Sequence, residues 1–108
     1  MRVFFDECVA RPLRKLLTSH ETKTAQELGW GRLKNGALIE KAESGGFEVF
    51  VTSDKNLKYQ QNLHDRKIAL LVLSTNYWPT LEKQRGLIIA ALIGIRSGQY
   101  VELTIPSH

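Results

Sequence analysis

The sequence predicts an α/β fold: one domain over residues 1–108, with three layers (α/β/α) and a mostly parallel sheet of five strands. Three observations support this prediction. Short apolar runs recur without the alternation of a half-exposed strand, which is typical of strands buried on both faces. Helical patterns separate these runs, so neighbouring strands are joined by crossovers and lie parallel. A chain of 108 residues is long enough to bury one core and needs no second domain.

The first strand is predicted at the start of the chain, where the apolar run Val3-Phe4-Phe5 ends abruptly in Asp6 and Glu7. Aromatic and β-branched residues favour a strand, and the lack of polar positions makes it a central one. Pro12 opens a helix with a stripe of leucines. Residues 20–25 then alternate with less apolar content, which predicts a second strand near the edge of the sheet.

The middle of the chain contains one turn, one helix and one strand. Gly29-Trp30-Gly31 predicts the turn. Asn35 is expected to cap the helix, and Gly45-Gly46 end it. Residues 47–52 form the third strand, which leads directly into Asp54.

The last part of the chain supplies two more strands and a long helix. A short polar helix is predicted to end near residue 62, followed by a strand over residues 68–73. Pro79 starts a helix that continues to Ser97, and residues 100–105 alternate as the fifth strand. The predicted strand order is 2-1-3-4-5, which places the ends of the first and third strands side by side.

The composition is that of an ordinary soluble globular protein, with 43% hydrophobic and 24% charged residues, which excludes the disordered and fibrous classes. Cys8 is the only cysteine, so the sequence offers no internal disulfide and no cluster of thiolate ligands. We see no leader pattern, and the longest apolar run, residues 86–95, is about half of the roughly 20 residues that a membrane helix needs. We therefore expect a cytoplasmic protein without a membrane segment.

Two predicted strands end in an acid at the same edge of the sheet, and this is the strongest chemical signal in the sequence. Asp6 and Asp54 would approach each other there, and two close carboxylates need a cation between them. Mg²⁺ or Mn²⁺ suits such oxygen ligands, keeps several waters and can activate water against a phosphate. Asp54 alone could instead cap a helix, and Glu7 either joins the site or points away from it.

Polar and basic residues are expected around this edge. Asn35 and Asn56 each start a predicted helix, where the amide either caps the helix or hydrogen-bonds a metal-bound water. The net charge of +4 permits a nucleic-acid partner and equally serves solubility. Four cations follow strand ends or begin helices near the acids, and we expect them to hold a phosphodiester substrate: Arg11, Lys34, Lys55 and Lys58.

Three segments carry a resemblance to a known family: MRVFFDE, GRLKNGALIEKAE and VFVTSDKNL. In this order and spacing they resemble the compact PIN-like proteins related to VapC-type toxins, which are metal-dependent ribonucleases paired with antitoxins. The similarity covers about the first two thirds of the chain. It implies a PIN-like fold and a Mg²⁺- or Mn²⁺-dependent endoribonuclease that is the toxin of a toxin–antitoxin system. RNA would be the substrate and a small helix-turn-helix antitoxin the partner.

The resemblance also assigns roles residue by residue. Asp6 matches the family's first acid and Asp54 matches an acid after a later strand, so both are expected to bind metal and serve catalysis, with Glu7 beside them. Asn35 stands where many relatives have Asp and Asn56 stands near a frequent second acid of the family, and both are expected to complete the metal site. The basic residues at the same edge would then contact RNA.

Two other functions remain open. The two Asn residues leave fewer anionic ligands than the relatives have, which fits a degenerate PIN-like module that binds RNA or protein without cleaving. A receiver-like phosphoacceptor domain also combines acids after its first and third strands with a Ser or Thr after the fourth, here Ser74 or Thr75. That class usually has a Lys before the proline after its last strand, whereas Ile105 precedes Pro106.

The helix predicted over residues 80–97 is apolar over more of its surface than one sheet can cover. Ile88 and Leu92 lie on one face, whereas Leu87 and Ile93 lie elsewhere on the helix. We therefore expect a second copy of the chain or an antitoxin segment to cover the remaining apolar surface.

Overall fold

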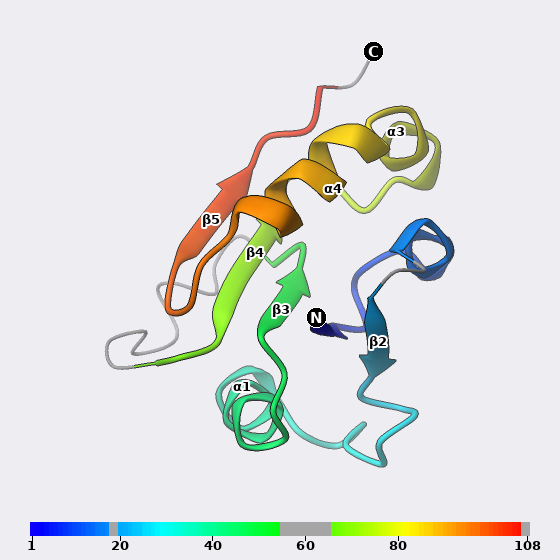
Figure 1. The fold of residues 1–108 in the computed structure, drawn as a ribbon. Coiled ribbons are helices and arrows are strands. Elements are labelled where there is room, and N and C mark those ends of the chain that lie inside the picture. Colours follow the sequence, from blue (N-terminus) through cyan, green and yellow to red (C-terminus); the bar gives the residue numbers. More distant parts are fainter. Residues whose placement is uncertain (18–19, 55–65, 107–108) are drawn as a thin grey trace.

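The computed structural model describes residues 1–17, 20–54 and 66–106 of the chain (Figure 1). Helices lie between successive strands, as the sequence predicts, except between β3 and β4, whose connection falls outside the described residues. Among the described residues, no helix is long and apolar enough to span a bilayer. The elements in chain order are β1 (Arg2–Phe5), the 3₁₀ helix η1 (Arg11–Leu17), β2 (Glu21–Thr24), α1 (Asn35–Ser44), β3 (Val49–Thr52), β4 (Ala69–Leu73), α3 (Trp78–Lys83), α4 (Arg85–Gly94) and β5 (Tyr100–Leu103).

The strands form one parallel sheet in the order β2-β1-β3-β4-β5, which confirms the predicted α/β class and strand order. β1 and β3 are neighbours, with Phe4 opposite Phe50. Hydrogen bonding continues one residue past β1, because the amide of Asp6 donates to the carbonyl of Val51 at 2.9 Å. Since the strands are parallel, the residues that follow β1 and β3 meet at the same carboxyl edge.

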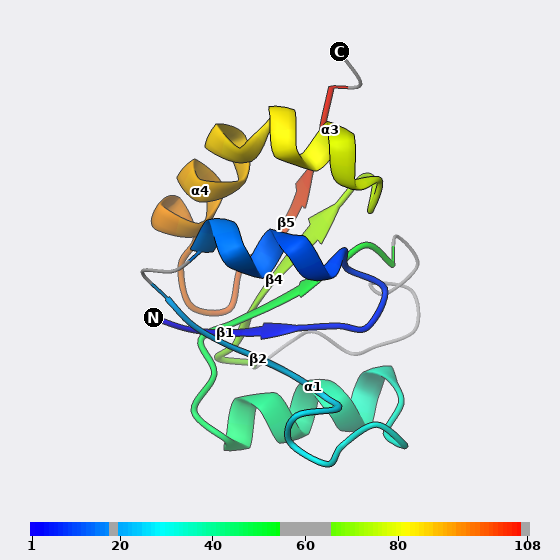
Figure 2. The same ribbon diagram turned by 90° about the vertical axis from the view of Figure 1, so that its right-hand side faces the viewer.

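Helices cover both faces of the sheet and complete three layers (Figure 2). η1, α3 and α4 lie on one face, where Leu13, Leu81 and Leu92 pack in one cluster with Val3 and Phe5. α1 lies on the other face and packs against the intervening strand positions. Successive side chains of a strand point to opposite faces, so a strand covered on both sides has to be apolar throughout. This explains the uninterrupted apolar runs of the sequence.

An aromatic cluster centred on Phe4 fills the core beneath α1. Phe4 stacks on Phe50 with ring centroids 5.2 Å apart and on Trp30 at 5.8 Å. Phe47 meets Phe4 edge to face at 5.5 Å. Offset and edge-to-face pairs at these distances are favourable beyond the area they bury. The cluster therefore holds the predicted turn at Trp30 against the sheet and fixes the loop that leads into α1.

Two helices replace the single long helix predicted over residues 80–97. They are separated at Gln84, which leaves the helical region with φ −105° and ψ 23°. Gly86 follows closely, and glycine weakens a helix interior, so the break costs little free energy. α4 then ends at Gly94, because Ile95 is extended with ψ 142°. The prediction of one continuous helix is therefore wrong.

The start of α1 and the segment after β1 also differ from the prediction. Lys34 is the N-cap, and its carbonyl accepts the first helical hydrogen bond from Leu38 at 2.8 Å, so the predicted cap at Asn35 is wrong by one position. The segment after β1 is a 3₁₀ helix, although Leu13 and Leu17 are buried as the leucine pattern indicates. The polar helix predicted to end near residue 62 lies outside the described residues.

Truncation of Phe4 should test the aromatic cluster. We expect Phe4→Ala to lower the free energy of unfolding by about 3–5 kcal/mol, because it leaves a cavity between three other rings. Phe4→Leu should cost clearly less, since it keeps most of the buried volume. Tyr77→Ala is the control: this side chain is 64% exposed, and its loss should change stability by less than about 0.5 kcal/mol. Urea denaturation measures all three, and equal losses for Phe4→Ala and Tyr77→Ala would contradict the assignment.

Candidate acidic site at the carboxyl edge

The hydroxyl of Thr52 connects the two predicted metal-binding acids. Thr52 is the last residue of β3 and is fully buried. Its Oγ1 donates to Oδ2 of Asp6 at 2.9 Å and accepts from the backbone amide of Asp54 at 3.0 Å. The structure therefore holds the carboxylate of Asp6 and the backbone of Asp54 at one buried hydroxyl, which fits the neighbouring positions of β1 and β3. The sequence reasoning did not single out Thr52, although a polar residue at the end of a fully apolar strand is a signal for it.

The carboxylate of Asp6 is held by donors on both oxygens. Oδ1 accepts from the amide of Glu7 at 2.9 Å, and Oδ2 accepts from Thr52. The thiol of Cys8 lies 3.5 Å from the same Oδ2 as a weak donor. A carboxylate has about four lone-pair sites, so these contacts leave Oδ1 able to take a further ligand. Asp6 is thus fixed in orientation and still able to hold a cation.

Cys8 joins the loops that follow three strands. Its sulfur lies 3.3 Å from the hydroxyl of Thr52 and accepts from the amide of Ser53 at 3.3 Å. Its carbonyl accepts from Nδ2 of Asn76, in the loop after β4, at 2.8 Å. Cys8 and Asn76 therefore position the site without being acids. Neither Cys8 nor Asn76 is among the site residues predicted from the sequence, because neither lies in a motif of its own.

The two hydroxyl residues after β4 serve the packing of nearby elements. Oγ of Ser74 accepts from the amide of Ile105 at 2.8 Å, which attaches the segment after β5. Oγ1 of Thr75 accepts from the amide of Tyr77 at 3.1 Å, at the start of α3. These contacts give both side chains a structural role in the loop.

Glu7 lies beside Asp6 at the mouth of a small depression. The two acids, together with Phe5 and Val9, line a cavity of about 250 Å³. Two arginines from η1 and polar residues at the end of β2 complete its wall: Arg11, Arg14, Thr24 and Gln26. Glu7 is exposed, so a group bound in this depression would meet one half-buried carboxylate and one that faces solvent. Glu7 thus lines the same depression as Asp6, and its role in a metal site stays a prediction.

The other predicted site residues are not gathered around Asp6. Arg11 lines the depression, whereas Lys34 is exposed at the start of α1, on the opposite face of the sheet. The side chain of Asn35 is not described, although its backbone begins α1. The predicted contributions of Lys55, Asn56 and Lys58 lie outside the described residues.

Within the described part of the chain, no three His, Cys, Asp or Glu side chains are placed to share a metal ion. A metal here would therefore depend on Asp6 and Asp54. Two carboxylates with several retained waters are a ligand set that Mg²⁺ accepts. Comparison of the chain with protein-family models, with curated proteins and with solved structures gives no match.

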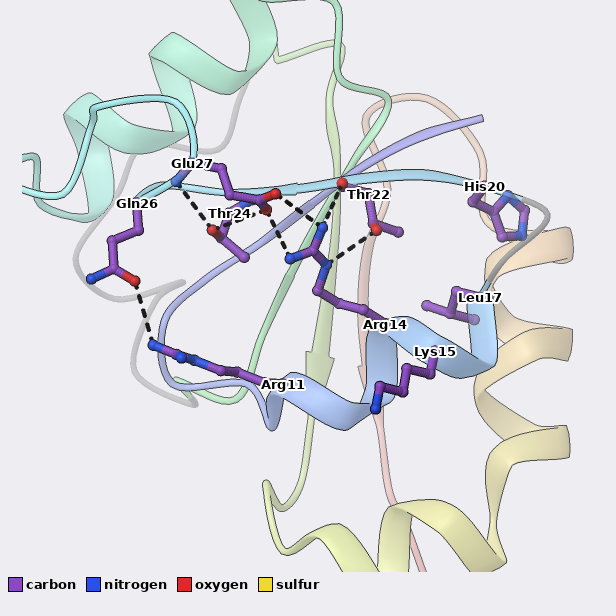
Figure 3. Close-up of a pocket in the computed structure, with 9 residues that line it drawn as sticks. All are labelled: Arg11, Arg14, Lys15, Leu17, His20, Thr22, Thr24, Gln26 and Glu27. Atoms are coloured by element: carbon purple, nitrogen blue, oxygen red, sulfur yellow. Dashed lines mark hydrogen bonds and ion pairs between the residues drawn. The ribbon is translucent and has the colours of Figure 1, made fainter.

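The ion pair between Arg14 and Glu27 lies beside the edge strand β2, next to this depression (Figure 3). Arg14 Nη1 lies 2.8 Å from Oε1 of Glu27, and Arg14 also donates to the carbonyl of Thr22 at 3.1 Å. The same Oε1 of Glu27 accepts from the amide of Thr24 at 3.0 Å. Burial raises the pKa of Glu27, but the hydrogen bonds from Arg14 and Thr24 and the charge of Arg14 outweigh it, so the pKa is lowered. The pair therefore satisfies backbone groups of an exposed edge strand.

Removal of the Thr52 hydroxyl should cost stability. We expect Thr52→Val to lower the free energy of unfolding by about 1–3 kcal/mol, because it leaves the amide of Asp54 without that acceptor and Asp6 without its buried donor. Thr52→Ser keeps the hydroxyl and should lose about 1 kcal/mol, the contribution of one buried methyl group. Chemical denaturation of the two variants distinguishes them. A Val variant as stable as the wild type would show that the hydroxyl does not organise this edge.

The Arg14–Glu27 pair should make stability depend on acid pH. Because folding lowers the pKa of Glu27, its contribution is complete above the unfolded value of about 4.3 and is lost as the pH falls through the folded pKa. We expect Glu27→Gln to destabilise the protein by about 0.2–1 kcal/mol at pH 7, the range of exposed ion pairs, and by less at pH 3. Urea unfolding at the two pH values measures this, with the exposed Glu40→Gln as the control. An unchanged difference between pH 7 and pH 3 would contradict it.

Proposed function

We propose that the protein is a Mg²⁺- or Mn²⁺-dependent endoribonuclease of the PIN-like class and the toxin of a toxin–antitoxin system. The observation that carries the proposal is the hydroxyl of Thr52, which hydrogen-bonds the carboxylate of Asp6 and the backbone amide of Asp54 at the carboxyl edge of a parallel sheet. Ligands of open α/β sheets bind at this edge. The sequence resemblance to PIN-like ribonucleases supports the same assignment.

The two acids fit a weakly bound divalent ion. Asp6 would use the remaining capacity of Oδ1, and Asp54 would supply the second carboxylate. A bound Mg²⁺ or Mn²⁺ supplies an activated water and neutralises charge on a phosphate. Glu7, exposed beside Asp6, is placed to accept a proton from a water on the open side of the site. Thr52 and Cys8 hold Asp6 in place during the reaction.

A second candidate function is RNA or protein binding without cleavage. The observation that favours it is the full set of donors on Asp6: Glu7, Thr52 and Cys8 all compete with a cation for its lone pairs. Among the described residues, no group of three acidic, His or Cys side chains is placed to share the ion. Both features lower metal affinity relative to a site with three or four acids.

The proposal includes a protein partner for α4. Leu87 is 41% exposed and Ile93 is 75% exposed, so apolar surface of this helix faces solvent. The resemblance points to a cognate antitoxin of the small helix-turn-helix type as the partner, and a second copy of the chain is the alternative. Cytoplasmic location belongs to the same proposal.

Cleavage of a mixed RNA pool tests the function. We expect cleavage with Mn²⁺ or Mg²⁺ and none with EDTA. Asp6→Asn and Asp54→Asn should each reduce the rate by about 100-fold or more, because loss of a ligand exceeds the usual 10–100-fold effect of losing a residue that only orients one. Glu82→Gln, an exposed acid on α3, is the control for charge alone.

Two results would overturn parts of this proposal. Metal-independent cleavage, or full activity of both Asn variants, would refute the mechanism. The non-catalytic alternative would replace it if the folded wild type binds RNA and cleaves it under no metal condition. Melting curves of all variants show whether a loss of rate reflects a loss of fold.

A further inference from the structure

A second, larger depression adjoins the acidic site along the edge strand. It has a volume of about 580 Å³ and lies between η1 and β2 (Figure 3). It begins at Leu17 and His20, follows Thr22 along the strand and reaches Glu27. The two depressions adjoin each other, because four residues line both of them: Arg11, Arg14, Thr24 and Gln26. A chain-like ligand bound in the larger depression would therefore extend into the smaller depression, which Asp6 lines.

The larger depression carries an excess of positive charge. Three basic side chains line it, Arg11, Arg14 and Lys15, together with one carboxylate, that of Glu27. Glu27 is already paired with Arg14 at 2.8 Å, so these two charges offset each other. Lys15 forms no ion pair or hydrogen bond with the described residues, and Arg11 makes a single long bond of 3.4 Å to Gln26. Two exposed cations thus remain for an anionic ligand.

The remaining wall suits a nucleotide chain. The hydroxyls of Thr22 and Thr24 and the amide of Gln26 can donate and accept hydrogen bonds. A volume of about 580 Å³ lies within the roughly 300–1,000 Å³ of sites that bind drug-sized ligands, which is also the size of a nucleotide. The depression is open on one side, as a site for part of a long chain has to be.

We propose that the depression between η1 and β2 holds the RNA strand next to the phosphate that is cut, with Arg11 and Lys15 contacting two of its other phosphates. The identity of the strand as RNA rests on the proposed function. Arg14 forms the wall between the two parts of the path, because its contacts to Thr22 and Glu27 hold it in place. The path lies on the η1 face of the sheet and does not include Lys34.

The opposite edge of the sheet provides a matched control. A depression of about 260 Å³ at the amino ends of the strands contains Lys67 and Arg96, but also Glu43 and Glu48. Its two basic side chains are matched by two acidic side chains. Removal of Lys67 and Arg96 changes the net charge of the protein as much as removal of Arg11 and Lys15, at a site that the proposal excludes.

The experiment measures binding of a fluorescein-labelled, single-stranded RNA of mixed sequence by anisotropy. EDTA is present so that metal-dependent cleavage cannot occur, and the salt concentration is varied. We expect the double variant Arg11→Ala, Lys15→Ala to reduce the slope of log K against log salt by about 1.4, since each phosphate contact on a single strand contributes about 0.7. The control Lys67→Ala, Arg96→Ala should keep the wild-type slope. Circular dichroism verifies that both fold.

A second measurement needs no variant. The wild type is photo-crosslinked to RNA that contains 4-thiouridine, and the attached peptides are identified by mass spectrometry. We expect crosslinks to η1 and to residues 20–27. Equal salt slopes for both double variants would overturn the inference, as would a slope reduced by Lys34→Ala but not by the Arg11, Lys15 double variant. The inference also fails if the crosslinks are confined to α1 or if the wild type binds no RNA. If these binding results hold and the wild type never cleaves RNA, the path stands and the proposed catalytic function fails.

Discussion

The parallel pairing of β1 with β3 is the constraint on which the rest of the structure depends. Both strands are four residues long and covered on both faces, so their register is set by packing: Phe4 and Phe50 meet beneath α1, and Val3 and Phe5 meet the opposite cluster. A slip of one residue would send every side chain to the wrong face. Because the register is fixed, Asp6 stands opposite the end of β3, and its amide bonds Val51.

The same contacts that position Asp6 also limit its chemistry. A carboxylate at a strand end needs donors to hold it still, and Thr52, Cys8 and the amide of Glu7 provide them. Each donor takes up acceptor capacity that a metal would use. The hydrogen bonds that orient Asp6 therefore lower its affinity for a metal. How strongly a metal binds depends on the lone pairs that remain free on Oδ1. Burial of Thr52 is tolerated because its hydroxyl is fully engaged.

Residues that stabilise the edge strand β2 also line the proposed substrate path. β2 is short and polar, and it pairs with β1 on one side. Arg14 and Glu27 bond the backbone of Thr22 and Thr24, so the edge is closed by side chains. This arrangement protects the edge from pairing with another chain. It also holds Arg14 in place on η1, so Arg14 has a structural role. Arg11 and Lys15 are exposed and can bind a ligand.

The sequence by itself determined the α/β class, the strand order and the position of Asp6 beside the end of β3, because buried parallel strands impose continuous apolar runs and their carboxyl ends share one edge. It did not reveal the break at Gln84, since a mild loss of helix propensity becomes a break only when packing decides it. Thr52, Cys8 and the Arg14–Glu27 pair were decided by the tertiary structure alone. Their partners lie 13 to 46 residues away in most cases, and only the folded chain sets such distances between polar side chains.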